Sequence, residues 1–161
     1  MIYCASTPTP LGDMLLVSDE SHLCGAYFMD QKYIPRVAPH WRTDADLPVM
    51  RQAREELDEF FRGQRRRFTV PVNPRGTAFQ RRVWQLLAAI PYGVTVSYGD
   101  LARQLGSARH ARAVGSATGR NPLSVIVPCH RVLGAGGSLT GYAGGLQRKR
   151  ALLCLEGIHQ A

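Results

Sequence analysis

The chain lacks most of the patterns that would place a protein in a membrane or a fibre. Its 161 residues contain no apolar run approaching the roughly 20 residues that cross a bilayer, and no collagen repeat or heptad array. Residues 1–12 have neither a basic leader nor a continuous apolar stretch, and they include Pro8 and Pro10. We therefore expect a globular, cytoplasmic monomer without a membrane partner, folded as one domain or two small ones.

Cysteine is scarce and never occurs as a CxxC pair. The four cysteines are Cys4, Cys24, Cys129 and Cys154. This spacing argues against a disulfide framework in a protein expected inside the cell. His22 and His40 could join Cys4 and Cys24 around a metal, but the spacing matches no standard zinc pattern. We expect no metal and no cofactor, and small buried side chains at Cys4 and Cys24. A metal at these two cysteines stays open as the alternative.

Acidic residues nearly disappear from the second half of the chain. Residues 1–72 hold 9 Lys and Arg against 10 Asp and Glu, whereas residues 73–161 hold 11 against only Asp100 and Glu156. A half this basic is attracted to a polyanion through counterion release, which favours nucleic acid as a partner. The same asymmetry occurs in proteins that never bind nucleic acid. It does isolate Glu156 as a carboxylate in a nearly acid-free region.

The first half has the pattern of a small α/β unit. Three apolar runs separated by turn residues predict an antiparallel meander, and they are residues 1–4, 14–17 and 23–28. Residues 31–48 carry three prolines and little periodicity, which predicts a loop. Apolar residues at helical spacing predict a helix over 48–61, ended by Gly63, and residues 68–72 have the composition of a last strand.

A change in composition and charge at residues 73–76 predicts a boundary between a first domain, 1–72, and a second domain, 73–161. Thr77 is the predicted N-cap of a helix that ends before Pro91. Two short helices over 97–106 and 108–119 then resemble a helix-turn-helix. The second is rich in small residues, which let a partner's backbone approach closely. Helix-on-helix packing requires small residues equally and is the alternative.

The candidate chemistry lies in Pro128-Cys129-His130-Arg131, which follows a strand-like run over 123–127 and precedes a glycine-rich stretch and a helix over 146–156. A buried cysteine is usually inert packing. Three features here favour a nucleophile: Pro128 fixes the backbone, Arg131 adds charge that favours thiolate, and the glycines leave room for a substrate.

Adjacent side chains on an extended strand point to opposite faces, so His130 would not bond directly to Cys129 on a strand. Either the chain turns sharply there or a water carries the proton between them. Within this half of the chain, Glu156 is nearly the only carboxylate that could orient the imidazole. Cys129, His130 and Glu156 thus form a hypothetical nucleophile, base and orienting group.

These residues carry a family resemblance. The segment Ile126–Val132 resembles the active-site signature of O6-alkylguanine-DNA alkyltransferases. Further matching segments, in order and spacing, are Arg112–Gly115, Asn121-Pro122, Gly141–Gly145 and Leu155–Gly157. The match is dense over residues 77–157, whereas the N-terminal half matches mainly in the turn Thr9–Gly12.

The resemblance implies an α+β fold with an N-terminal antiparallel-sheet, ribonuclease-H-like domain and a C-terminal winged helix-turn-helix-like domain. It implies direct-reversal DNA repair, in which Cys129 takes a methyl or larger alkyl group from O6 of guanine, or O4 of thymine, in a flipped-out base. The thioether that forms is not hydrolysed, so each molecule acts once. His130 would take the thiol proton through a water while Glu156 holds the imidazole.

Other residues receive roles from the same resemblance. Tyr98 matches the proton donor to the guanine ring, and Asn121 matches the residue that links the backbone of the helix-turn-helix to the active-site segment. The backbone carbonyls of Cys129 and Val132 would accept from the guanine amino group. The predicted remaining substrate-binding residues are Tyr142, Ala143, whose N–H would donate to O6, and Gly144. Tyr98 as a packing residue and Asn121 as a simple Asn-Pro turn are the alternatives.

The implied partner is double-stranded DNA with alkylated guanine, bound through the minor groove. Arg112 matches the finger that fills the space left by the flipped base, and the accompanying DNA-binding residues are Ala111, Ala113 and Gly115. A solvated helix charge or a phosphate contact is the alternative for Arg112. Many relatives carry Ser at the position of Ala143, so this chain keeps the backbone donor to O6 but lacks a side-chain hydrogen bond to it.

Two other functions compete with alkyl transfer. Some members of the family bind lesions without transfer, but they replace the cysteine that Cys129 retains. A cysteine hydrolase using Cys129 and His130 would turn over many times on an acyl substrate, and it leaves the basic second half unexplained.

Overall fold

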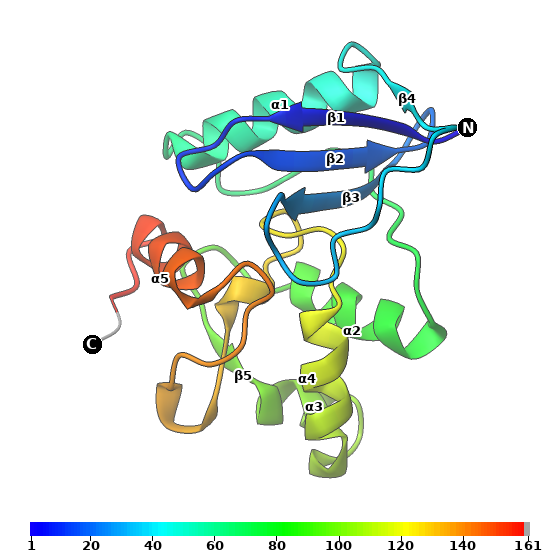
Figure 1. Ribbon diagram of the computed structural model, residues 1–161. Helices are drawn as coiled ribbons and strands as arrows, with labels where there is room; N and C mark the ends of the chain where they lie inside the picture. The colour runs from blue at the N-terminus through cyan, green and yellow to red at the C-terminus, as the bar shows by residue number, and fades with distance from the viewer. Residues whose placement is uncertain (160–161) are drawn as a thin grey trace. The chain divides into compact units, whose positions relative to one another are not determined.

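The computed structural model describes residues 1–159, which divide into two compact units. The first unit contains residues 1–75 together with Pro122–Ile126, and the second contains Gly76–Asn121 and the chain from Val127 onward. An N-terminal sheet covered by a helix and a mainly helical C-terminal unit make up the chain (Figure 1). The predicted α+β class is confirmed.

The sheet of the first unit has the strand order β3-β2-β1-β4. Its strands are β1 (Tyr3–Thr7), β2 (Met14–Ser18), β3 (Leu23–Phe28) and β4 (Arg42–Thr43). The strands β1, β2 and β3 pair antiparallel in sequence order, so the predicted meander is confirmed. Strand β4 pairs parallel with β1 inside the segment predicted as a loop. Strand β4 has only two residues, and both are exposed. It is therefore too short to show the alternation of apolar and polar residues by which a strand is predicted.

Helix α1 (Pro48–Phe61) has the predicted bounds and covers one face of the sheet through contacts with β2 and β3. Proline at the first position is compatible with a helix start, because the N–H that proline lacks has no acceptor there. The apolar residues that α1 buries are Val49, Met50, Ala53, Leu57 and Phe60. On the sheet, Cys4, Leu15 and Val17 form a separate buried cluster, so Cys4 is a packing residue.

The predicted strand over 68–72 is wrong. Only an isolated bridge between Leu23 and Val72 forms there. The backbone N–H groups of Thr69 and Val70 donate instead to the carboxylate of Glu56 on α1, at 2.8 and 3.0 Å. Burial alone raises the pKa of Glu56, but its hydrogen bonds outweigh burial and lower the pKa below 4.5. The Glu56 carboxylate therefore accepts the backbone N–H groups that would otherwise pair with a neighbouring strand.

The second unit begins with α2 (Ala78–Ala88), whose N-cap is Thr77 as predicted, with a capping box completed by Gln80. It continues through β5 (Val96–Ser97), α3 (Tyr98–Gln104), a 3₁₀ turn η1 (Ala108–His110) and α4 (Ala111–Gly119). The predicted helix over 108–119 is thus divided into η1 and α4. Helix α4 contacts α2 and α3, and the Trp84 indole on α2 donates to the carbonyl of Ala117 on α4 at 2.8 Å.

The predicted strand over 123–127 is also wrong, because Val125 has a φ of 73°, which reverses the chain. Residues Pro122–Ile126 belong to the first unit, where the Ala26 N–H on β3 donates to Pro122 and the Ser124 N–H donates to Ala26. A single boundary near residue 72 cannot describe this excursion. The second unit then resumes with η2 (Cys129–Arg131), β6 (Val132–Leu133), η3 (Ala135–Gly137) and α5 (Leu146–Leu155).

No helix within residues 1–159 combines the length and the apolar character that crossing a membrane requires.

Candidate active site

Cys129 begins the 3₁₀ turn η2 and is not on an extended strand. The backbone closes the turn with hydrogen bonds from the Cys129 N–H to Val127 and from the Arg131 N–H to Pro128, at 2.8 and 3.0 Å. The side chain of Cys129 is buried, with 6% of the residue exposed. Of the two arrangements that the sequence left open, the sharp turn is therefore present.

The imidazole of His130 is fully buried and held from one side. Its Nε2 lies 2.6 Å from Oε2 of Glu156, and its Nδ1 has no hydrogen-bond partner among residues 1–159. Burial lowers the pKa of His130, with the Glu156 carboxylate opposing that shift, so the ring is neutral near pH 7. Because an ionised carboxylate only accepts, Nε2 carries the ring proton and Nδ1 presents a lone pair. Nδ1 is therefore available as a base.

Glu156 is the C-cap residue of α5, and its side chain accepts several hydrogen bonds. Its carboxylate accepts from His130, from Nε and Nη2 of Arg131 at 2.8 and 2.9 Å, and from the Gly93 N–H at 2.9 Å. Burial alone raises the pKa of Glu156, but the hydrogen bonds from His130 and Arg131 outweigh it and lower the pKa to about 2. The predicted pair of His130 and Glu156 is thus brought together.

Arg131 has a different role from the one its sequence position suggested. Its guanidinium group pairs with Glu156, donates from Nη1 to the Ile90 carbonyl at 2.6 Å and lies over the Tyr92 ring. Because this charge is already neutralised by Glu156, it is poorly placed to favour a thiolate. Arg131 instead fixes the carboxylate that orients His130.

Two side chains favour the thiolate form of Cys129. Burial raises the pKa of this thiol, whereas the hydrogen bond with Asn121 and the charge of Lys149 lower it. Asn121 also donates from Nδ2 to the Val127 carbonyl at 2.9 Å, which ties the end of α4 to the turn. This contact makes Asn121 more than an isolated Asn-Pro turn.

Lys149 was missed by sequence reasoning. It lies on α5, its side chain is fully buried, and its Nζ donates to the carbonyls of Thr140 and Gly141. A signal was present, because Lys149, Leu152 and Leu153 have the i, i+3, i+4 spacing of one apolar helix face. A lysine is usually exposed, so its position in that pattern was not recognised.

Tyr98 directly follows β5, which pairs parallel with β6, the strand that begins three residues after Cys129. Val96 pairs with Val132 and Ser97 with Leu133, and Tyr98 is the next residue along the chain. Burial raises the pKa of Tyr98, and the charge of Cys129 raises it further. The Tyr98 hydroxyl donates to the Thr140 carbonyl at 3.4 Å. The phenol thus keeps its proton near the thiol.

The glycine-rich stretch forms a loop between β6 and α5. The predicted substrate residues Tyr142 and Ala143 are half-buried in it, and Gly144 is buried. The Gly145 N–H closes a turn by donating to the Tyr142 carbonyl at 2.9 Å. Gly141 has a φ of 61°, and a Cβ atom there would lie 3.3 Å from the Tyr98 hydroxyl. Glycine at this position therefore allows the loop to approach Tyr98.

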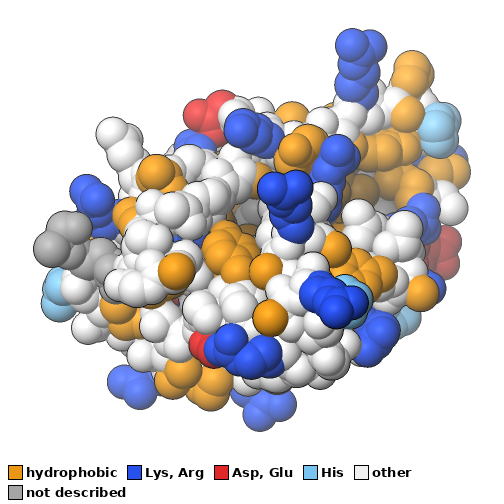
Figure 2. Space-filling model, turned by 90° about the horizontal axis from the view of Figure 1, so that it is seen from below, with side chains coloured by type: hydrophobic (Ala, Val, Ile, Leu, Met, Phe, Trp, Pro, Cys, Tyr) orange, Lys and Arg blue, Asp and Glu red, His pale blue; other side chains and the backbone are white. Residues whose placement is uncertain are grey.

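Helix α4 has one packed face and one exposed face. Val114, Ala117 and Thr118 are buried, whereas Arg112 and Ala113 are exposed, and Ala111 and Gly115 are half-exposed. A Cβ atom at Gly115 would meet nothing within 4 Å. Internal helix packing therefore does not require the small residue at Gly115. Figure 2 shows a face on which Lys and Arg side chains are common and Asp and Glu are few.

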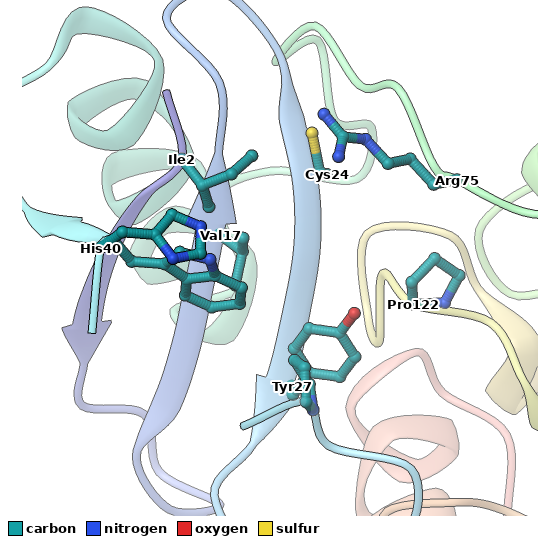
Figure 3. Close-up of a pocket in the computed structure, with 9 residues that line it drawn as sticks. Ile2, Val17, Cys24, Tyr27, His40, Arg75 and Pro122 are labelled. Carbon is teal, nitrogen blue, oxygen red and sulfur yellow. The ribbon is translucent and has the colours of Figure 1, made fainter. Parts of the chain in front are cut away.

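A separate hollow lies within the first unit (Figure 3). It has a volume of about 340 Å³, and its lining includes Cys24, Tyr27, His40, Trp41 and Arg75. Burial raises the pKa of Cys24, which favours an inert thiol. Cys4 and His22 are not among its lining residues. No group of three or more His, Cys, Asp or Glu side chains in the described part of the chain could hold a metal ion.

Comparison with known proteins first defines the class. Residues 2–74 match the family model "6-O-methylguanine DNA methyltransferase, ribonuclease-like domain", and residues 78–158 match the model "6-O-methylguanine DNA methyltransferase, DNA binding domain". These two models together span almost the whole chain. The chain belongs to the O6-methylguanine DNA methyltransferase family, which confirms the resemblance and extends it to the N-terminal half.

Individual relatives agree over nearly their full length. A methylated-DNA–protein-cysteine methyltransferase from Mycobacterium bovis is 46% identical over 156 residues, covering 97% of this chain and 93% of its own. The constitutive one from Bacillus subtilis is 38% identical, with coverages of 95% and 93%. Crystal structures of the Mycobacterium tuberculosis O6-methylguanine methyltransferase and of OGT in complex with DNA both give TM-scores of 0.87. Their identities are 46% and 44%, with 97% and 96% of this chain and 93% and 92% of theirs covered.

Proposed function

We propose that this protein repairs alkylated DNA by direct reversal, transferring a methyl or larger alkyl group from O6 of guanine, and from O4 of thymine, to Sγ of Cys129. The observation that carries the proposal is a buried thiol beside His130, whose Nδ1 lone pair is unoccupied while Glu156 fixes Nε2. Family membership supports the choice of substrate, since the relatives are named methylated-DNA–protein-cysteine methyltransferases.

The reaction begins with removal of the thiol proton by Nδ1 of His130, through one water molecule. The thiolate then attacks the alkyl carbon in line, a C–S bond forms, and the bond from that carbon to O6 breaks. The electron pair moves onto the guanine ring, which takes a proton from the Tyr98 hydroxyl. The phenolate regains a proton from solvent. Cys129 becomes a thioether that water does not cleave, so each chain reacts once.

The base would be held mainly by backbone groups. Carbonyls of Cys129 and Val132 accept from the guanine amino group, and the N–H of Ala143 donates to the departing O6. Tyr142 and Gly144 complete the loop around the base, and Asn121 keeps the turn and the thiol in register. Ala143 retains the backbone donor and offers no side-chain hydrogen bond to O6. These groups supply the chemistry without a metal or cofactor.

The partner we propose is double-stranded DNA, approached by α4 through the minor groove. Arg112 occupies the space of the flipped-out base, and Ala111, Ala113 and Gly115 allow the backbone of α4 to come close. The open space at Gly115 supports this role over internal packing. The crystal structure of the M. tuberculosis relative in complex with DNA supports DNA as the partner. We propose that the protein works as a monomer in the cytoplasm, where thiols stay reduced.

The decisive experiment measures the intact mass of the protein after incubation with duplex DNA that contains O6-methylguanine. We expect a gain of one methyl group per chain and no second gain, with the methyl on the Cys129 peptide. Cys129→Ser should gain nothing, while Cys154→Ser, which changes an exposed cysteine, should react as the wild type does. Binding of the lesion without a mass gain would favour a non-catalytic lesion-binding protein. Multiple turnovers on an acyl ester would favour a hydrolase.

Arg112→Ala should slow transfer from methylated duplex DNA by about tenfold or more, because flipping costs a few kcal/mol and each 1.4 kcal/mol is a factor of ten. Reaction with free O6-benzylguanine, which needs no flipping, should be nearly unchanged. Single-turnover rates on both substrates provide the measurement. Arg109→Ala removes an equal exposed charge from η1 and serves as the control for simple charge loss. Equal losses on the two substrates in Arg112→Ala would refute the finger role.

A further inference from the structure

We infer that Lys149 is a positioning residue of the transfer site, which ties the glycine-rich loop to α5 and supplies the positive charge that stabilises the Cys129 thiolate. This inference rests on the proposed function, because it assigns Lys149 a role at the same thiol. It concerns a residue that neither the sequence motifs nor the pairing of His130 with Glu156 explains.

The first support is the set of contacts that Lys149 makes. Nζ donates to the Thr140 carbonyl at 2.7 Å and to the Gly141 carbonyl at 3.0 Å. The Thr140 carbonyl also accepts from the Tyr98 hydroxyl at 3.4 Å. One ammonium group therefore connects α5 with the loop segment that leads into Ala143, at the point where Tyr98 also contacts that loop.

The second support is the balance of buried charge. Arg131 is paired with Glu156, and His130 is neutral, so these three groups carry no net charge together. The acceptors found for Lys149 in the described part of the chain are two neutral carbonyls. A buried ammonium without an anion is unfavourable. Ionisation of Cys129 supplies that anion, so the charge of Lys149 favours the thiolate, which is the nucleophilic form.

The pKa shifts of Lys149 and Cys129 agree with this coupling in both directions. Burial lowers the pKa of Lys149 to about 8, and the charge of Cys129 opposes that shift. The charge of Lys149 in turn lowers the pKa of Cys129 against the effect of burial. It also lowers the pKa of His130, which keeps the imidazole neutral and able to accept a proton.

The composition of the chain makes the choice of lysine informative. Lys32 and Lys149 are its only lysines, whereas arginine supplies the other 18 basic side chains. Arginine stays charged in every protein environment, and its planar group needs room and several acceptors. Lysine carries a compact charge that responds to its surroundings. The buried position that interacts electrostatically with the thiol therefore has the type of cation whose pKa can change with the ionisation of Cys129.

The first test measures the alkylation of Cys129 by iodoacetamide as a function of pH, without DNA, with the Cys129 peptide followed by mass spectrometry. Lys149→Met keeps most of the side-chain volume and removes the charge. We expect the midpoint of reactivity to rise and the rate at pH 7 to fall about tenfold for each unit of that rise. Arg150→Met removes an exposed charge from the same helix and should leave the midpoint unchanged. A wild-type midpoint in a Lys149→Met protein with native circular dichroism would overturn the inference.

The second test needs no substitution at Lys149 and therefore holds even if Lys149→Met does not fold. With lysine labelled by ¹³C at Cε, only two signals appear, and Lys32 is the internal control. The pKa of Lys149 should be lower in Cys129→Ser than in the wild type, because the hydroxyl never supplies the anion. An identical Lys149 titration in both proteins would overturn the inference. Neither test uses DNA, so the mass measurement on methylated duplex judges the proposed function separately.

Discussion

Glu156→Gln should lower the free energy of unfolding by about 3–5 kcal/mol, the range for breaking a buried ion pair from one side. Only 5% of Arg131 and 7% of Glu156 are exposed, so the substitution leaves a guanidinium charge buried without an anion. The amide of Gln also replaces an oxygen by a donor in a site where Arg131, His130 and Gly93 all donate. At least one pair of donors must then face each other.

Urea denaturation at pH 7 measures this effect. Asp58→Asn is the matched control, because Asp58 pairs with Arg62 at the surface, where both side chains are more than 60% exposed. Such a pair contributes about 0–1 kcal/mol. If Glu156→Gln and Asp58→Asn reduced stability by the same small amount, the buried network would not be important for the fold.

The pH dependence of wild-type stability should show the same network. The pKa of Glu156 is about 2 in the folded chain against 4.5 for the free group, so its contribution is present above pH 4.5. As the pH falls from 4.5 toward 2, the unfolded chain gains a proton that the folded chain does not, and stability decreases. The shift corresponds to about 3 kcal/mol at most. Glu156→Gln should lose this part of the slope.

His130→Gln should slow alkyl transfer at pH 7 by about 10²–10⁴-fold, the range that a positioned general base contributes. The amide can still donate to Glu156, but it offers no basic lone pair where Nδ1 stands. Burial raises the pKa of the Cys129 thiol, so little thiolate forms at neutral pH without a base. Binding of methylated duplex should change little, since His130 is fully buried.

Single-turnover rates between pH 7 and 10 distinguish loss of a base from general damage. The gap between the wild type and His130→Gln should narrow as the pH rises, because hydroxide ionises the thiol in both proteins. A gap that stays constant would indicate misplacement of Cys129 and not loss of a base. Wild-type transfer by His130→Gln at pH 7 would remove His130 from the mechanism.

Local signals were sufficient to locate the two longest helices, α1 and α2. Apolar spacing and Pro48 located α1, and the Thr77 cap located the start of α2, because these features act within one turn of the helix. The two wrong strands, 68–72 and 123–127, failed for reasons that are not local. In one case the donors go to Glu56, which lies 13 residues earlier, and in the other Val125 adopts a left-handed backbone conformation.

The site shows the same division. Cys129, His130 and Glu156 could be proposed from residue type and from the scarcity of acids in the second half. The pairing of Arg131 with Glu156 and the buried charge of Lys149 could not, because both depend on which side chains the fold removes from water. Composition could identify the candidate catalytic residues. Only the three-dimensional packing shows that Arg131 is paired with a carboxylate, whereas Lys149 donates to carbonyl groups.

The passage of Pro122–Ile126 through the first unit interlaces the two halves of the protein along the chain. No single peptide bond separates them, since the polypeptide leaves the second unit after Asn121 and re-enters it two residues before Cys129. A fragment starting at Gly76 would carry Leu123 without the strand β3 to which it bridges at Ala26, and buried Val125 without the rest of its unit. Ala26 would lose its backbone partners at Pro122 and Ser124. The N-terminal sheet thus holds the polypeptide through β3 just before the turn that carries Cys129. Replacing the first unit by another domain would have to preserve these hydrogen bonds.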